Sequence, residues 1–336
     1  MIADLEKIGA DLLFEANMRA EAPHITVRMV TYMHAAFIVK AVSSILEGTY
    51  NDYELIISDD ASPDDTKEVL LEYLRGYKGK GQVRYVRMRK NGGVDGFGHS
   101  HVFRILTRGR LLMGMDGDDF SCPDRLEKTA ALWDSLSPKP SMMVVNAYRY
   151  VDGSIDGFAK PDFVPKGERR FYPPGDLFGP VPVFGSGSVV SREFSDWTAQ
   201  FKNLYKIFAA DAVRTKRALM DKGVWFVNES LFYYRVHSGS ATHQSAVKWT
   251  HDRLLRWKQL KSDVQVVYGG ANVDQNIVRR IDYWIKRTQY METLELSSNL
   301  KWLLLWPRVW LYSPYSAYRA LKTRIKIIIR RSKYSI

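Results

Sequence analysis

Three carboxylates fall within four positions of the chain, at Asp116, Asp118 and Asp119. Crowded negative charges repel one another unless a cation lies between them, and hard oxygen ligands suit Mg²⁺ or Mn²⁺. A metal bound there would bridge a substrate diphosphate and neutralise the charge on a leaving nucleoside diphosphate. Asp and Gly are also common turn residues, so the segment by itself fits an acidic turn that caps the next helix equally well.

Two other polar segments stand in comparable positions. Residues 31–34 (Thr-Tyr-Met-His) end one apolar, β-rich run, and residues 58–62 (Ser-Asp-Asp-Ala-Ser) end another. In open parallel sheets, ligands bind outside the carboxyl ends of the strands. The three segments together therefore indicate one ligand site at that edge of a sheet.

The elements that would position these residues alternate between short β-rich runs and helical stretches, which is typical of a parallel sheet with crossover helices. The pattern predicts strands at 25–31, 53–58, 82–88, 110–115 and 142–150, with helices near 35–47, 64–77, 101–107 and 123–136. A Pro- and Gly-rich stretch at 152–187 predicts a loop region over the site. The later elements are a helix at 206–222, a strand at 224–227 and a β-rich run at 231–237.

In four segments that occur in the same order, the sequence resembles glycosyltransferase family 2, whose members have the GT-A fold. The matching segments are 25–34, 55–62, 115–126 and a second half that runs from Asp211 to the Tyr-Arg-Val-His sequence at 234–237. Agreement of several segments in order is more specific than one Asp-x-Asp match. The resemblance implies an α/β, Rossmann-like fold with a mixed, mostly parallel sheet flanked by helices.

We expect four regions along the chain. The first 22 residues carry acidic side chains among apolar ones and predict an N-terminal amphipathic helix. The regions are the N-terminal helix (1–22), a GT-A catalytic domain (23–243) with a nucleotide-binding half (23–150) and an acceptor half (151–243), a helical region (244–295), and a basic amphipathic tail (296–336).

The resemblance implies a nucleotide-binding role for residues at three strand ends. Thr31 and Tyr32 match the position that holds the nucleotide base, where the Tyr32 ring would stack on uracil; an ordinary packed aromatic is the alternative. Asp60 matches a carboxylate that accepts a hydrogen bond from the base. For the neighbouring Asp59 and Ser62, capping of the next helix is as plausible as ligand contact.

For the metal, the resemblance points to Mn²⁺ or Mg²⁺ held by Asp118, Asp119 and His237, with Asp116 on the nucleotide sugar. The sequence leaves open which of the three carboxylates takes which role. An imidazole ligand suits Mn²⁺ better than Mg²⁺. The alternative for His237 is a histidine that only fixes its loop by hydrogen bonds.

Asp211 matches the family's general base, which deprotonates the acceptor hydroxyl on the face opposite the leaving diphosphate. A single carboxylate suffices for inversion, whereas double displacement needs a nucleophile as well. Two departures from the family pattern occur. Ala210 stands where Glu is common, and Gly98 and His99 replace an Arg-Asn pair that would contact the diphosphate. We interpret His99 as an ordinary surface residue.

The charge of the chain is concentrated in its tail. The formal net charge is +12, but residues 296–336 contain nine basic and no acidic residues, so the remainder carries only +3. Aromatic residues and a basic amphipathic pattern predict that this tail lies on an anionic membrane surface, although packing on the domain or on another subunit is the alternative. We expect no nucleic-acid partner, because no nucleic-acid motif accompanies the basic charge.

The leading hypothesis is a metal-dependent, inverting hexosyltransferase. It would move sugar from a nucleotide sugar, most simply a UDP-sugar, to a glycan or lipid-linked acceptor in cell-surface polysaccharide synthesis. A polyprenyl-phosphate glycosyltransferase is one alternative, and a non-catalytic membrane scaffold that binds nucleotide sugar is another. The single Cys122 cannot form an internal disulfide, and no apolar run reaches the length of a membrane span. We therefore expect a cytoplasmic protein, peripheral on the inner face of the cell membrane.

Overall fold

The computed structural model describes residues 1–92, 97–160, 164–207, 209–240, 246–269 and 274–296. The chain divides into two compact units, each described by itself below. Unit 1 comprises Met1–Phe201 and Ala209–Ser240, and unit 2 comprises Lys202–Phe208 and Ala241–Ile336. The predicted boundary after residue 243 therefore lies close to the end of unit 1.

Unit 1 is built on one mixed sheet whose strands follow the order β1-β4-β3-β2-β5-β10-β7-β11-β6, with β8 beside β7 and β9 beside β11. Strands β4, β3, β2 and β5 are parallel, and so are β7 and β11. The strands are β1 (Ala10–Ala16), β2 (Ile25–Thr31), β3 (Tyr53–Asp59), β4 (Gln82–Met88), β5 (Leu111–Asp116), β6 (Phe120–Ser121), β7 (Met142–Val151), β8 (Ser154–Phe158), β9 (Arg169–Tyr172), β10 (Ser188–Ser191) and β11 (Val224–Val236).

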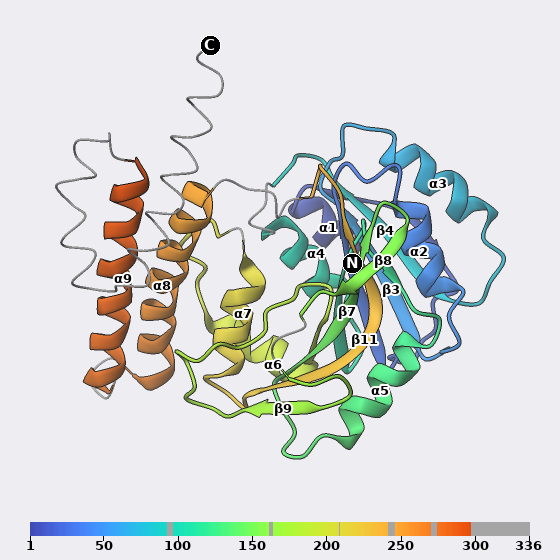
Figure 1. The fold of residues 1–336 in the computed structure, drawn as a ribbon. Coiled ribbons are helices and arrows are strands. Elements are labelled where there is room, and N and C mark those ends of the chain that lie inside the picture. Colours follow the sequence, from blue (N-terminus) through green and yellow to red (C-terminus); the bar gives the residue numbers. More distant parts are fainter. Residues whose placement is uncertain (93–96, 161–163, 208, 241–245, 270–273, 297–336) are drawn as a thin grey trace, which may run out of the picture. The chain divides into compact units, whose positions relative to one another are not determined.

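Helices cover both faces of this sheet, with α2, α3 and α5 on one side and α4, α6 and α7 on the other (Figure 1). In α2 the buried residues recur at the spacing of one helical face, and β3 is buried along its whole length, as expected of a central parallel strand. The helices of unit 1 are α1 (Ile2–Lys7), α2 (Ile38–Leu46), α3 (Thr66–Gly76), α4 (Phe97–Leu106), α5 (Arg125–Ser135), α6 (Arg192–Trp197), the 3₁₀ turn η1 (Thr198–Gln200) and α7 (Ala210–Ala218).

The order of the strands reverses between β2 and β5. The chain passes from β2 outward to β3 and β4, then returns to place β5 on the other side of β2. In open α/β sheets, ligands bind at the carboxyl ends of the strands beside such a switch point. Val30 pairs with Asp116 across this junction, so the predicted acidic segment begins at the switch point.

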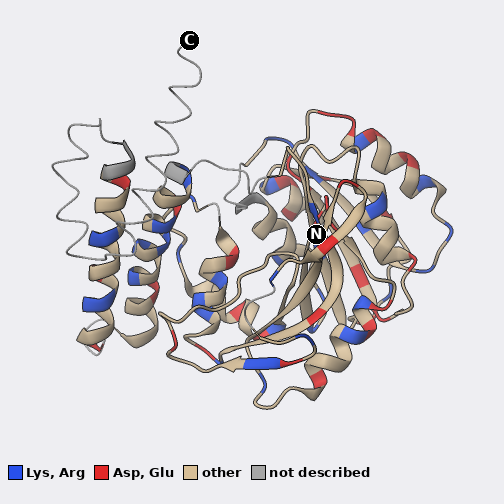
Figure 2. Cartoon of the chain, in the orientation of Figure 1, with Lys and Arg blue, Asp and Glu red and all other residues tan. Residues whose placement is uncertain are grey.

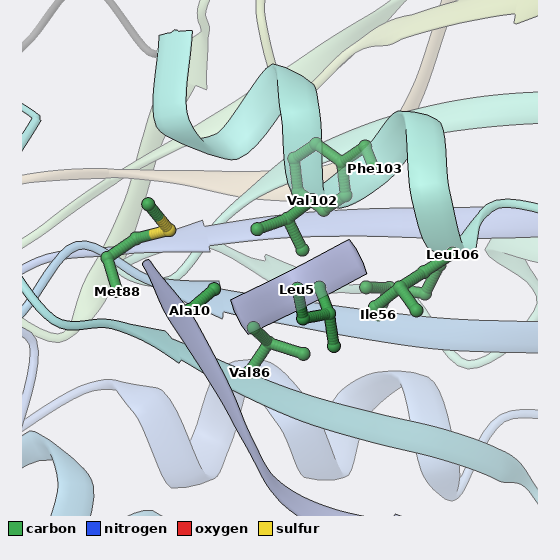
Figure 3. Close-up of a cluster of buried hydrophobic side chains, with 8 residues drawn as sticks. All are labelled: Leu5, Ala10, Ile56, Val86, Met88, Val102, Phe103 and Leu106. Atoms are coloured by element: carbon green, nitrogen blue, oxygen red, sulfur yellow. The ribbon is translucent and has the colours of Figure 1, made fainter. Parts of the chain in front are cut away.

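The N-terminal segment differs from the prediction. Residues 1–22 form the short helix α1 followed by strand β1, which pairs antiparallel with β4. The single helix predicted there is wrong, because the pairing of this edge strand with a partner about 70 positions later in the chain is not visible in local periodicity. Leu5 and Ala10 are each 1% exposed and pack with residues of β3, β4 and α4 (Figure 3). Burial of a leucine side chain stabilises by about 2 kcal/mol, so this segment belongs to the core.

Two later elements also differ. The predicted loop region 152–187 contains strands β8 and β9, and the two runs predicted at 224–227 and 231–237 form the single long strand β11, whose register with β7 shifts in two places. The helix predicted at 206–222 is shorter and begins at Ala210. The short β10, between β5 and β7, was not predicted because four residues carry little pattern.

Unit 2 contains two long helices, α8 (Ala246–Tyr268) and α9 (Gln275–Leu296), which pack against each other. The rings of Trp257 and Trp284 stack with centroids 5.4 Å apart, and Lys261 pairs with Asp282 at 2.6 Å. These contacts confirm the predicted helical region. None of the described helices is long and apolar enough to cross a membrane. The predicted basic tail at 296–336 lies outside the described residues, save for Leu296 at the end of α9.

Acidic and basic side chains are interspersed over unit 1 rather than segregated (Figure 2). This distribution agrees with the small net charge that the sequence leaves once the tail is set aside. The charges that bear on a ligand site are therefore local arrangements at the sheet edge.

Candidate active site at the sheet switch point

The ends of β2 and β5 approach each other closely at Gly117. A Cβ atom at this position would lie 2.7 Å from Thr31 Oγ1 and 2.9 Å from His34 Nδ1, closer than side-chain atoms tolerate. The Gly117 amide donates a hydrogen bond to the Val30 carbonyl at 2.8 Å. Glycine at the middle of the Asp-x-Asp segment thus lets the acidic turn lie directly against the end of β2.

The Asp116 carboxylate is fixed by Ser186. The Ser186 hydroxyl donates to Asp116 Oδ2 at 2.9 Å and accepts the Asp116 amide hydrogen at 3.0 Å. Solvent reaches the Asp116 side chain, but surrounding protein atoms and the Asp118 charge raise the pKa of Asp116 to about 7, against the lowering effect of Ser186. Asp211 contributes to this rise, which places it in the electrostatic neighbourhood of Asp116. The Asp211 charge is thus near enough to act on Asp116, although no direct contact joins the two carboxylates among the described residues.

Asp118 faces two imidazoles. Its Oδ2 lies 3.1 Å from His237 Nε2 and 3.9 Å from His34 Nε2. Burial lowers the pKa of His34, partly offset by the Asp118 charge, and a neutral imidazole is the form that binds a metal. Carboxylate and imidazole are both ligand types that Mn²⁺ accepts, but these three side chains are not grouped as a metal site among the described residues.

Asp119 has different surroundings from Asp118. The residue is 1% exposed, and its Oδ1 accepts the Arg235 amide hydrogen at 2.9 Å. Its Oδ2 is buried, and none of the described residues forms a hydrogen bond to it. Burial, followed by the charges of Asp118 and Asp116, raises the pKa of Asp119 well above its usual value. Arg235 also donates from Nε to the Asp118 carbonyl at 2.8 Å.

The three predicted metal ligands are not assembled as a set. Among the described residues no group of three His, Cys, Asp or Glu side chains stands at ligating distances. Asp118 and His237 meet, whereas the contacts of Asp119 tie the acidic turn to β11. Metal binding by these residues stays a prediction.

Asp59 and Asp60 are adjacent in the chain, but their carboxylates have different hydrogen-bond partners. Both oxygens of Asp59 are used internally: Oδ1 accepts from the Ser62 amide at 2.9 Å, and Oδ2 accepts from the Tyr85 hydroxyl at 3.0 Å. Arg87 Nε lies 3.3 Å from the same Oδ2. Of the two roles left open for Asp59, the contacts favour holding the turn before α3.

Asp60 is held at the entrance to α4. Its Oδ1 accepts the Gly92 amide hydrogen at 2.8 Å and lies 3.9 Å from His99 Nε2. His99 Nδ1 is 2.7 Å from the Ser58 hydroxyl, and the residue is 5% exposed. The interpretation of His99 as a surface residue is wrong, because its side chain is buried between its own helix α4 and Ser58 of β3, with Asp60 nearby.

Asp211 lies in the first turn of α7, where its Oδ1 accepts the Ala212 amide hydrogen at 2.9 Å. A carboxylate at a helix N-terminus is stabilised in its ionised form, which is the form a general base needs. Two cations, Lys160 and Arg214, are also attracted to it. Lys160 is half-buried, and burial lowers its pKa while Asp211 opposes that shift.

The two residues predicted to hold the base differ in burial. Thr31 is fully buried, and its hydroxyl lies 3.3 Å from His34 Nδ1. The Tyr32 side chain is 40% exposed, which leaves its ring accessible for stacking.

Comparison with known proteins gives the same assignment. Residues 26–187 match the family model described as "Glycosyl transferase family 2". Residues 26–187 therefore form a glycosyltransferase family 2 domain. Among its curated relatives, glycosyltransferase GlyG of Streptococcus pneumoniae is 23% identical over 81% of this chain and 89% of the relative. The putative colanic acid biosynthesis glycosyl transferase WcaA of Escherichia coli is 24% identical over 54% of this chain and 59% of the relative.

Solved structures of glycosyltransferases share the fold. TarS residues 1–349 from S. aureus, in complex with UDP-GlcNAc, align with a TM-score of 0.57 at 13% identity, over 87% of this chain and 82% of that chain. The mannosyltransferase PcManGT from Pyrobaculum calidifontis, in complex with GDP-Man and Mn²⁺, aligns with a TM-score of 0.51 at 15% identity, over 93% and 88%. The predicted GT-A fold is thereby confirmed.

Several residues of this glycosyltransferase site were not singled out by sequence reasoning. His34 and Ser186 stand within polar segments at a strand end and at a glycine-rich turn, so position was an available signal. Lys160 and Arg214 offered none, because each reaches the site through packing of distant elements.

Proposed function

We propose that the chain is an inverting, metal-dependent hexosyltransferase that takes its sugar from a UDP-sugar. The acceptor is a hydroxyl of a glycan or lipid-linked glycan in cell-surface polysaccharide synthesis. The observation that carries the proposal is the strand-end carboxylate Asp116 at the switch point of the sheet, held by Ser186 and near enough to the helix-start carboxylate Asp211 for their charges to interact. The UDP-GlcNAc complex of TarS supports the class of donor, and the putative role of WcaA in colanic acid biosynthesis supports the class of pathway.

The residues divide the reaction between them. Asp211 accepts the proton of the acceptor hydroxyl while the oxygen attacks the anomeric carbon, and the bond from that carbon to the diphosphate oxygen breaks with inversion. Asp116, fixed by Ser186, orients the donor. Asp60 and Tyr32 hold the nucleotide base, with His99 orienting Asp60.

Asp118 and His237, with His34 beside them, would hold Mn²⁺ or Mg²⁺ in this scheme. The ion supplies charge neutralisation for the leaving diphosphate. The buried Asp119 keeps β11, and therefore His237, next to the acidic turn through its contact with the Arg235 amide. The Mn²⁺ complex of PcManGT supports the choice of ion.

The experiment measures donor binding, donor hydrolysis and transfer separately, with a panel of nucleotide sugars and with or without Mn²⁺. We expect Mn²⁺-dependent turnover and a product of inverted anomeric configuration by NMR. Asp211→Asn should keep donor affinity and lose transfer by about 100-fold or more, the order of a general-base contribution. Asp176→Asn, a change in the same unit remote from these contacts, is the matched control. No binding of any nucleotide sugar would contradict the proposal.

Two outcomes would favour an alternative function. Transfer that is insensitive to Asp211→Asn would favour a polyprenyl phosphate acceptor, because that acceptor already carries an ionised nucleophile. Binding without turnover against every acceptor would favour the non-catalytic scaffold.

The proposed location is the cytoplasmic face of the cell membrane, with residues 296–336 as the attachment. The nine basic residues there are the support. Sedimentation with vesicles tests this, since anionic vesicles should bind the full chain and neutral ones should not. Replacement of Arg330 and Arg331 by Gln should weaken binding. Equal binding to both vesicle types would contradict an electrostatic attachment.

A further inference from the structure

Arg28 is an unusual residue at the centre of the sheet. It stands in the middle of β2, between Val27 and Met29, which are fully buried. Its guanidinium carbon lies 5.8 Å from the centroid of the Phe103 ring, and the side chain is half-buried. In the part of the chain that the structure describes, no carboxylate pairs with Arg28 and no hydrogen bond uses its guanidinium.

A second guanidinium approaches the same point. Arg28 is paired in the sheet with Gly114, which has no side chain, and a Cβ there would lie 3.2 Å from Ser188 Oγ. Arg214 Nη1 donates to that Ser188 hydroxyl at 3.5 Å. Burial, and to a smaller extent the Arg214 charge, lower the pKa of Arg28 to about 9. The two cations therefore converge above Gly114.

Such an arrangement is unfavourable without an anion. Half-buried cations that face each other lose hydration and repel. Arg214 is attracted to Asp211 and Asp116, but the described residues provide no ion pair within 4 Å for it. A ligand that brings a negative group to this place would relieve the repulsion.

The depth of the pair indicates which part of a donor it meets. Arg28 precedes Thr31, the last residue of β2, by three positions, which is roughly 10 Å along a strand. The diphosphate belongs beyond the strand ends, next to Asp118 and His237. Arg214 follows Asp211 by three residues on one face of α7, so the pair lies beside the base, where the transferred sugar must be.

We propose that Arg28 and Arg214 recognise a carboxylate on the donor sugar, so that the donor is a nucleotide-linked uronic acid. This rests on the proposed function of the same site. A guanidinium binds a carboxylate through two parallel hydrogen bonds, which a neutral hydroxymethyl group does not reproduce. The site thereby selects the oxidised sugar over its neutral counterpart.

Calorimetric titration with Mn²⁺ present tests the inference, using UDP-glucuronate against UDP-glucose, UDP-galacturonate against UDP-galactose, and UDP alone. We expect at least one uronate to bind about tenfold or more tightly than its neutral counterpart, the order of a charged hydrogen bond. Arg28→Met and Arg214→Met should reduce that preference to within about twofold. Arg104→Met, an exposed change on α4 that removes a hydrogen bond to His101, should preserve it.

The outcomes distinguish failure of the uronate inference from failure of the proposed function. If UDP binds and neither uronate is preferred, the inference is overturned while the proposed function stands. If UDP itself fails to bind, the proposed function fails and the inference with it. A preference that survives both Arg28→Met and Arg214→Met also overturns it.

Thermal unfolding gives a second readout that does not depend on turnover. Because Arg28 is unpaired, Arg28→Met should raise the unfolding midpoint of the unliganded protein and abolish the extra rise that a uronate donor gives over a neutral one. A lower midpoint for unliganded Arg28→Met would mean that Arg28 stabilises the fold by itself, and would overturn the inference.

Discussion

The Asp118 carboxylate lies 3.1 Å from Nε2 of His237, although 119 positions separate the two residues in the chain. In the absence of a metal the imidazole donates a hydrogen bond there, and a bound Mn²⁺ would replace that proton. His237→Ala should therefore weaken Mn²⁺ binding by about tenfold or more, as loss of a metal-site partner does. Titration of Mn²⁺ followed by electron paramagnetic resonance measures this. His251→Ala, an exposed histidine of α8, is the control, and equal losses in both variants would contradict the assignment.

The close approach at Gly117 gives a steric prediction. Gly117→Ala would place a methyl group 2.7 Å from Thr31 Oγ1, so the acidic turn has to move away from β2. We expect unfolding free energy to fall by about 1–3 kcal/mol, the range for overpacking, and donor affinity to fall with it. Gly76→Ala is the matched control because nothing lies within 4 Å of its added methyl group. Unchanged denaturation and donor binding in Gly117→Ala would show that the turn is not constrained.

The neighbours Asp59 and Asp60 should separate stability from binding. Asp59→Asn removes the charge that pairs with Arg87 and accepts from Tyr85, so unfolding free energy should fall by about 1–3 kcal/mol. Asp60→Asn should leave stability nearly unchanged and weaken UDP binding. Denaturant unfolding and UDP titration on both variants check this. The reverse pattern would exchange the two roles.

These same residues show which parts of the site could be predicted from the sequence. The strand-end segments were predictable because a buried apolar run followed by polar turn residues is a local pattern, and Thr31, Asp60 and Asp116 stand where it puts them. The direction in which each side chain points was not predictable. Asp118 and Asp119 are adjacent, yet Asp118 faces two imidazoles and Asp119 accepts from the Arg235 amide. Strand β1 was missed because its partner, β4, is distant in the chain.

His99 is buried although the sequence pattern around it predicts a surface residue. Its burial leads to a further prediction. His99 touches Ser58 and lies near Asp60, so it is a positioning residue for the nucleotide. His99→Ala should weaken UDP binding several-fold, whereas Arg104→Ala, one turn later and exposed, should not. Conservative His99→Asn, which can still bond Ser58, should recover part of the affinity. Full affinity in His99→Ala would confine the residue to core packing.

Lys160 connects Asn146 of β7 to the proposed base Asp211. Asn146 accepts the Lys160 amide hydrogen at 3.1 Å, and the lysine charge is attracted to Asp211 from a half-buried position. Loss of a neighbouring cation disfavours an ionised carboxylate, so in Lys160→Met the acidic limb of the kcat profile should move to higher pH. Rate profiles between pH 4 and 9, with saturating donor, measure the shift. Lys166→Met, an exposed lysine in the same segment, is the control. A lower kcat without displacement of the acidic limb would assign Lys160 to substrate positioning instead of to stabilisation of the ionised base.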